Sequence, residues 1–150
     1  MQRRPRVLIP DGEPLVLAAR RIVLRLETDC VVWLASDPRT ALETVSKIEL
    51  DVVISDFRMP HMDGVSFLER VRRLRPAAWL ILLTGLADRS RVNRAVVGMG
   101  LEFMEKHWSN EALVRSVQSV LAAPPMSGET GQLFCHLRSI CSTNRPRNRE

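Results

Sequence analysis

The chain has 150 residues, of which 45% are hydrophobic and 26% charged, so it has the length and the apolar content for one domain with a full core. The net charge of +5 is spread along the chain without interleaved aromatic residues, which argues against direct nucleic-acid binding, and the three cysteines lack zinc-site or disulfide-framework spacing. The sequence has neither a signal-peptide pattern nor a membrane-spanning apolar run of about 18 residues, so we expect a cytoplasmic protein.

The amino-terminal part of the chain alternates short apolar runs with amphipathic segments. Residues 7–9 form the first run, and apolar residues between Leu15 and Leu26 recur after it at helical spacing. Residues 31–35 form the second run, and Asp37 before a proline is typical of a helix start. We therefore expect two strand–helix units here.

The middle of the chain continues the same alternation. Residues 51–55 are apolar on both faces, and the helix after them can begin with Asp63 as its cap and end before Pro76. Residues 79–83 form the fourth apolar run, which a short helix around Val92 follows. These segments predict two further strand–helix units.

The last strand candidate is residues 101–104, and a final helix capped by Ser109 ends before Pro124. Apolar strands that alternate with amphipathic helices predict a doubly wound parallel sheet of five strands, covered on both faces. We expect the folded domain at residues 1–123 and a basic, largely disordered tail at residues 124–150, in which a short helix can form. A second domain does not fit in this length.

Four of the predicted strands are followed by a polar residue that can take part in chemistry: Asp11, Asp56, Thr84 and Lys106. The carboxyl ends of parallel strands share one edge of a sheet, where such sheets bind ligands. This set suits phosphoryl transfer to a carboxylate. Mg²⁺ held by Asp11, Asp56 and the backbone carbonyl of Arg58 would offset the repulsion between carboxylates and phosphoryl group. The lysine would neutralise one phosphoryl oxygen, and the threonine hydroxyl would donate to another.

Four segments also fall in an order that is typical of one family. They are VLIPDGEPLV, DVVISDFRMPHMDGVSFLERVR, ILLTGLAD and FMEKHW. Over residues 6–121 the sequence resembles the response-regulator receiver domains of two-component signalling, and SDFRMPHMDG is the most specific segment. The resemblance implies a flavodoxin-like (βα)5 fold and a signalling protein that works in a phosphorelay.

The resemblance implies a role for each residue of the predicted site. Asp56 is then the phosphoacceptor, Asp11 an acid of the metal site, Thr84 the switch hydroxyl and Lys106 the lysine that contacts the phosphoryl group, while Gly64 helps to shape the loop after Asp56. The phosphoryl donor is then a histidine kinase or a histidine phosphotransfer protein. A downstream protein target would bind the face formed by the fourth helix, the fifth strand and the fifth helix.

The sequence departs from the family pattern at two positions. Gly12 stands where the family has a second acid, and His107 stands where it has a proline after the lysine. One carboxylate fewer should weaken the binding of Mg²⁺ and slow phosphorylation, although water can fill a ligand position. A non-proline residue favours a trans peptide bond, so the loop at Lys106 can take a different course.

The sequence also bears on other classes of function, namely a degenerate receiver, an enzyme and a nucleotide-binding module. Gly12 and His107 suit a degenerate receiver, which would bind partners without being phosphorylated. An enzyme with Asp56 as nucleophile is disfavoured, because Arg58 stands where aspartate-based phosphatases carry a second acid, and we do not expect an enzyme. A glycine-rich nucleotide-binding motif does not follow the first strand. Because DNA-binding output would need a second domain, we expect signalling through protein contacts.

Overall fold

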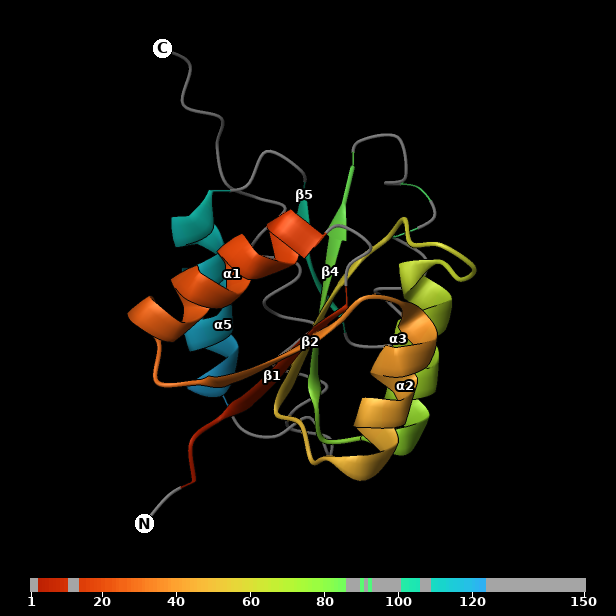
Figure 1. The fold of residues 1–150 in the computed structure, drawn as a ribbon, viewed down its shortest axis with the longest axis horizontal. Helices are drawn as coiled ribbons and strands as arrows, with labels where there is room; N and C mark the ends of the chain where they lie inside the picture. Colours follow the sequence, from red (N-terminus) through yellow and green to blue (C-terminus); the bar gives the residue numbers. More distant parts are fainter. Residues whose placement is uncertain are drawn as a thin grey trace.

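The strands form one parallel sheet between the helices (Figure 1). The sheet has five strands in the order β2-β1-β3-β4-β5. The structure is a computed structural model, and it describes residues 3–10, 14–85, 90, 92, 101–105 and 109–123. The strands are β1 (Arg6–Pro10), β2 (Val31–Ala35), β3 (Val52–Asp56), β4 (Trp79–Thr84) and β5 (Glu102–Glu105). The helices are α1 (Pro14–Glu27), α2 (Pro38–Lys47), α3 (Gly64–Leu74) and α5 (Asn110–Leu121). The predicted five-stranded, doubly wound sheet is confirmed, and its strand order is the flavodoxin-like one.

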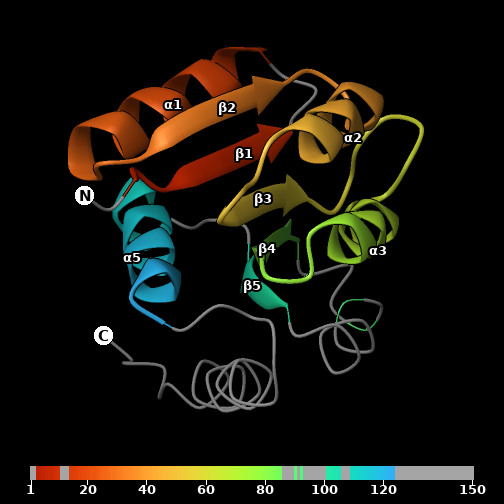
Figure 2. The same cartoon turned by 90° about the horizontal axis from the view of Figure 1, so that it is seen from below.

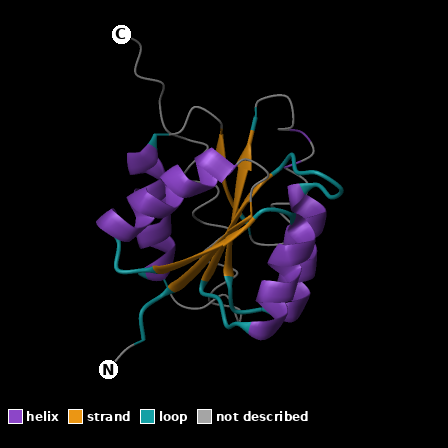
Figure 3. Ribbon diagram, in the orientation of Figure 1, coloured by secondary structure: helices purple, strands orange, loops and turns teal. Residues whose placement is uncertain are grey.

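The helices cover the sheet on both faces, as Figures 2 and 3 show. Helices α1 and α5 lie side by side on one face, while α2 and α3 lie on the other. Alternate residues of each strand therefore enter two separate apolar cores. The α1/α5 core includes Ile9, Leu24, Ile54, Leu83, Leu113 and Val117, and the α2/α3 core includes Leu8, Val45, Val53, Phe67, Leu68 and Leu82. Among the described helices, none is long and apolar enough to cross a membrane.

The observed strands follow the predicted ones closely. β2 has the predicted bounds, and each of the other strands differs from the prediction by one residue at one end or both. The shift of β3 by one residue makes Asp56 the last residue of the strand. Of the short helix expected after β4, the structure describes only Ser90 and Val92, so this prediction falls largely outside the described residues.

Three predicted helix caps are confirmed. Oδ1 of Asp37 accepts a hydrogen bond from the amide of Thr40 at 2.9 Å, and Oδ1 of Asp63 accepts one from the amide of Ser66 at 2.8 Å. Ser109 likewise accepts a bond from an amide in the first turn of α5. Backbone and side-chain hydrogen bonds from Thr40 hold the pKa of the Asp37 carboxyl below its ordinary value. The caps thus fix where α2, α3 and α5 begin.

Helix α1 has an unusual distribution of side chains. Leu15, Ile22 and Leu26 recur at helical spacing, yet they are 86%, 58% and 78% exposed. The face toward the sheet instead contains Leu24, which is fully buried, and Arg20, which is 7% exposed. The apolar stripe that predicts this helix is therefore its outer face, and a charged residue lies on the inner one.

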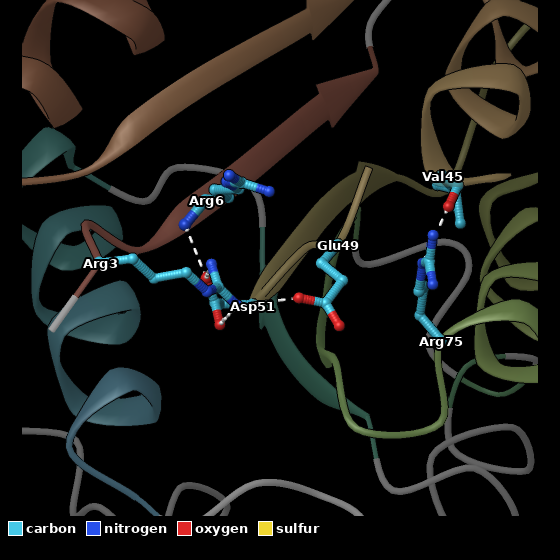
Figure 4. A network of polar contacts seen from close by, with 6 residues as sticks. All are labelled: Arg3, Arg6, Val45, Glu49, Asp51 and Arg75. Carbon is cyan, nitrogen blue, oxygen red and sulfur yellow. Dashed lines mark hydrogen bonds and ion pairs between the residues drawn. The ribbon is translucent and has the colours of Figure 1, made fainter. Parts of the chain in front are cut away.

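A polar network closes the amino end of the sheet, where β1 and β3 begin (Figure 4). The Nη1 and Nη2 atoms of Arg3 donate to the two carboxylate oxygens of Asp51 at 2.9 and 3.1 Å. The backbone amide of Arg6 donates to the same carboxylate at 2.8 Å. Nearby, Nε of Arg75 donates to the carbonyl oxygen of Val45 at 2.9 Å and joins the end of α3 to α2.

Candidate functional site

Asp56 lies at the carboxyl edge of the sheet, at the end of a strand that pairs with both β1 and β4. Its side chain is 15% exposed, so the carboxylate is largely enclosed but still reachable from solvent. The amide of Phe57 donates to the carbonyl of Leu83 at 2.8 Å, which continues the pairing with β4 beyond the carboxylate. Oγ of Ser55 donates to the carbonyl of Asp56 at 3.0 Å. The main chain is therefore held on both sides of this carboxylate.

Arg20 brings a positive charge to Asp56 from helix α1. Its Nη1 atom lies 3.3 Å from Oδ2 of Asp56, and its side chain is only 8% exposed. At this separation two unit charges attract by about 5 kcal/mol at an effective dielectric near 20, before the cost of desolvating both groups. Sequence reasoning misses this residue, because a basic residue in an amphipathic helix usually faces solvent. It lies four residues before the buried Leu24 and so on the same side of the helix, but that this side faces inward becomes apparent only in the folded structure.

The loop after Asp56 returns to the main chain of that residue at Gly64. The amide of Gly64 donates to the carbonyl of Phe57 at 2.6 Å. A Cβ atom on Gly64 would overlap the carbonyl oxygen of Asp56 and would lie 2.9 Å from its carbonyl carbon and from Cδ1 of Leu82. A side chain at this position therefore cannot be accommodated without moving Asp56. This close approach is the physical basis of the expected loop-shaping role of Gly64.

Thr84 ends the neighbouring strand, β4. In the register of β3 and β4, Asp56 lies opposite Leu83, so Thr84 is one residue further along the same edge of the sheet. Thr84 is 1% exposed, and its Oγ1 donates to the carbonyl of Gly85 at 3.2 Å. The structure thus brings this hydroxyl and the Asp56 carboxylate to the ends of adjacent strands.

Several residues of the predicted site lie outside the described residues. They are Asp11, Gly12, Lys106 and His107. Their placement, and with it the metal-ligand role of Asp11 and the phosphate contact of Lys106, stays a prediction. Arg58, whose backbone carbonyl is the third predicted metal ligand, is described and has an exposed side chain.

The sequence profile of one family matches most of the chain. It is the profile of the response regulator receiver domain, and it matches residues 7–118, a span that contains the predicted site. The chain belongs to the response regulator receiver family. The family assignment confirms the resemblance carried by SDFRMPHMDG, and it places the chain in two-component signalling.

Solved structures support the same fold for this receiver. The signal receiver domain of an HD domain-containing protein from Pseudomonas fluorescens is 28% identical, with a TM-score of 0.73 and coverage of 80% of this chain and 96% of that one. A CheY-like response regulator receiver domain protein from Methanospirillum hungatei has a TM-score of 0.74 at 22% identity, with coverage of 80% and 95%. The second likeness concerns the fold alone, because its sequence identity is low.

The curated relatives of the receiver are longer proteins. A protein-glutamate methylesterase/protein-glutamine glutaminase from Thiobacillus denitrificans is 34% identical over 104 residues, which are 67% of this chain and 29% of the relative. A protein of the same description from Geobacter metallireducens is 36% identical over 86 residues, which are 57% of this chain and 23% of the relative. The chain therefore spans less than a third of the length of these relatives.

These relatives correct one expectation from the sequence, namely that the protein is not an enzyme. That expectation is contradicted by these curated relatives, because both are named as enzymes. The expectation is based on the motifs of this chain alone, whereas each relative's name describes a protein of which the matched part is less than a third. The lack of the phosphatase motif after Asp56 therefore says nothing about the activity of a longer protein that contains a receiver.

Receiver domains generally bind Mg²⁺ at their acidic pocket, so the described residues can be tested against such a site. Mg²⁺ requires carboxylate, carbonyl and water oxygens around it. Here the guanidinium of Arg20 lies against Oδ2 of Asp56, and a dication on this carboxylate would be repelled by that positive charge. Within the described part of the chain, no group of three or more His, Cys, Asp or Glu side chains could hold a metal. By themselves, without Asp11, the described residues therefore do not make up an ordinary Mg²⁺ site, and Arg20 disfavours a dication at this oxygen of Asp56.

Proposed function

We propose that this receiver accepts a phosphoryl group on Asp56 from the phosphohistidine of a histidine kinase or a histidine phosphotransfer protein. The observation that carries the proposal is the carboxylate of Asp56, which is enclosed but reachable at the carboxyl edge of the sheet. This edge is where open parallel sheets bind their ligands, and carboxylates are established nucleophiles in phosphoryl transfer. Membership of the receiver family supports the same role.

The reaction needs one nucleophile and one leaving group. An oxygen of the Asp56 carboxylate attacks the phosphorus atom, and the bond from phosphorus to the imidazole nitrogen breaks. The imidazole keeps the electron pair and takes up a proton, and the product is an acyl phosphate on Asp56. In this proposal Lys106 neutralises one phosphoryl oxygen. The hydroxyl of Thr84 turns from the carbonyl of Gly85 and donates to another phosphoryl oxygen.

We further propose that this receiver binds Mg²⁺ weakly. The ligands proposed for the metal are the carboxylates of Asp11 and Asp56 and the backbone carbonyl of Arg58. Gly12 contributes no carboxylate, and the affinity of a protein site for such a cation depends on how many charged ligands it has.

The proposed output is a protein contact. A downstream target would bind the face formed by the fourth helix, β5 and α5. The pairing of β4 with β5 supports this choice, because Thr84 lies opposite Glu105 at the end of that pair. A hydroxyl that turns toward a phosphoryl group at this position changes the structure next to that face.

The test is phosphorylation in vitro, read as intact mass. The wild type and two variants, Asp56→Asn and Asp51→Asn, are incubated with phosphoramidate or acetyl phosphate. Asp51 lies just before the opposite end of β3, so it is the matched control. We expect one phosphoryl adduct on the wild type and on Asp51→Asn, and none on Asp56→Asn. The proposal is wrong if the wild type stays unmodified under conditions that label another receiver, or if Asp56→Asn is labelled equally well.

A further inference from the structure

We propose that Arg20 is a built-in cation of the phosphorylation site. It neutralises Asp56 and thereby lowers both the affinity of the site for Mg²⁺ and the dependence of phosphorylation on Mg²⁺. This inference rests on the proposed role of Asp56 as phosphoacceptor. It starts from one contact between two elements that lie far apart in the sequence. Nη1 of Arg20, in α1, lies 3.3 Å from Oδ2 of Asp56, at the end of β3.

The position of the guanidinium is set by the packing of α1 against the sheet. Arg20 is buried on the same side of the helix as Leu24, which is fully enclosed in the α1/α5 core. A charge in such surroundings is costly unless it is paired. Asp56 is one acid with which it is paired, so a positive charge already lies at this carboxylate before any ligand arrives.

The neighbouring exposed arginine shows that this placement is particular to one position. Arg21 follows directly in the same helix, and its side chain is exposed to solvent. Two consecutive arginines thus have opposite environments, and only Arg20 has the ion pair with Asp56. The basic composition of α1 alone does not account for the contact.

The net charge of the site is the sum of the charges of its side chains. The carboxylates of Asp11 and Asp56 would together contribute two negative charges, and Gly12 contributes none. Lys106 would contribute one positive charge and Arg20 adds a second, so a divalent cation would meet a site of charge 0 instead of −1. Because the charge of Arg20 belongs to the folded chain, this neutralisation does not depend on the concentration of an ion, whereas neutralisation by Mg²⁺ does. A receiver with such a site can accept a phosphoryl group over a wide range of Mg²⁺ concentrations.

The first experiment measures metal binding to the unphosphorylated chain. Binding of Mn²⁺ is followed by loss of the free-ion signal in electron paramagnetic resonance, and binding of Mg²⁺ by calorimetry. The proteins are the wild type, Arg20→Met and the matched control Arg21→Met. We expect Arg20→Met to bind both ions about tenfold more tightly or better, because one repulsive charge is removed. Arg21→Met should bind like the wild type.

Two further variants separate charge from folding. Arg20→Lys keeps the positive charge, so its metal affinity should stay low. Arg20→Gln keeps a hydrogen-bond donor for Asp56 without the charge, and it replaces Arg20→Met if circular dichroism shows that variant to be unfolded. Equal metal affinity of the wild type and of the folded neutral variant overturns the proposal.

The second experiment compares rates of labelling by phosphoramidate in EDTA and in excess Mg²⁺. The wild type should be labelled at similar rates in both, while Arg20→Met should depend strongly on Mg²⁺. The same dependence in both proteins overturns the inference and leaves the proposed function intact. Failure of every protein to be labelled, together with tighter metal binding by Arg20→Met, overturns the proposed function but supports the role of Arg20 as the cation.

Discussion

An aspartate lies at each end of strand β3, Asp51 just before its first residue and Asp56 as its last, and each contacts an arginine from another segment. At the amino end, Arg3 donates to both carboxylate oxygens of Asp51, at 2.9 and 3.1 Å. At the carboxyl end, Nη1 of Arg20 lies 3.3 Å from Oδ2 of Asp56. By hydrogen-bond geometry alone, the pair at the amino end is the better one.

By burial, the pair at the carboxyl end ranks above the pair at the amino end. The side chains of Arg3 and Asp51 are 47% and 31% exposed, whereas those of Arg20 and Asp56 are 8% and 15% exposed. Water and salt screen the first pair, and each long side chain loses conformational freedom when it forms. In the second pair both charges are largely enclosed, so the removal of one partner costs more than it does in water. Burial, more than hydrogen-bond geometry, therefore decides how much stability is lost when one partner of the ion pair is removed.

The largest effect on stability is expected at the carboxyl end. Arg20→Met should lower the free energy of unfolding by about 3 kcal/mol, because it removes a charged partner from the enclosed carboxylate of Asp56. Urea denaturation followed by circular dichroism measures this change. The double variant Arg20→Met/Asp56→Asn should recover most of it, and Arg21→Met should stay within about 0.5 kcal/mol of the wild type. If Arg20→Met lost as little stability as Arg21→Met, the buried ion pair would not be the more stabilising of the two pairs.

A smaller effect is expected from the loop that closes against Asp56. Gly64→Ala should lower the free energy of unfolding by about 2 kcal/mol, because the added methyl group overlaps the main chain of Asp56. Glu69→Ala, at an exposed position of the same helix, is the control and should have little effect. Thermal unfolding of the three proteins measures the difference. If helix propensity alone mattered, Gly64→Ala would instead be the more stable protein.

The smallest effect is expected at the amino end. Arg3→Met should lower the free energy of unfolding by less than about 1 kcal/mol, since the ion pair with Asp51 is exposed. The loss should shrink further when NaCl is raised, because salt screens exposed charges. Urea denaturation at low and at high salt measures both quantities. A loss as large as that of Arg20→Met would mean that geometry outweighs burial.

Much of the fold could be predicted from the sequence, because local patterns specify it. Strands that are buried on both faces appear as continuous apolar runs, so their ends lie within one residue of the prediction. The starts of α2, α3 and α5 are specified by capping residues such as Asp63, whose effect needs only the first turn of the helix. The position of Asp56 at the edge of the sheet follows from the same strand pattern.

The ion pair at the site could not be predicted in this way. The outer apolar stripe of α1, with Leu15 and Leu26, gives the same helical spacing as a buried stripe would, so periodicity indicates the helix but not its inner face. Which face turns inward is decided by packing against the sheet and α5. Arg20 and Asp56 are 36 residues apart, and no local pattern links them. Their contact therefore appears only once the helix is docked.

The outer face of α1 has a consequence for how the receiver behaves in concentrated solution. This helix has an arginine inside and an isoleucine and two leucines in contact with water. Molecules with a net charge of +5 repel one another at low ionic strength, and added salt screens that repulsion. Sulfate salts also strengthen the attraction between apolar surfaces. The receiver should therefore be most soluble in dilute buffer and should self-associate as sulfate is added, the opposite of a protein whose molecules associate through charges.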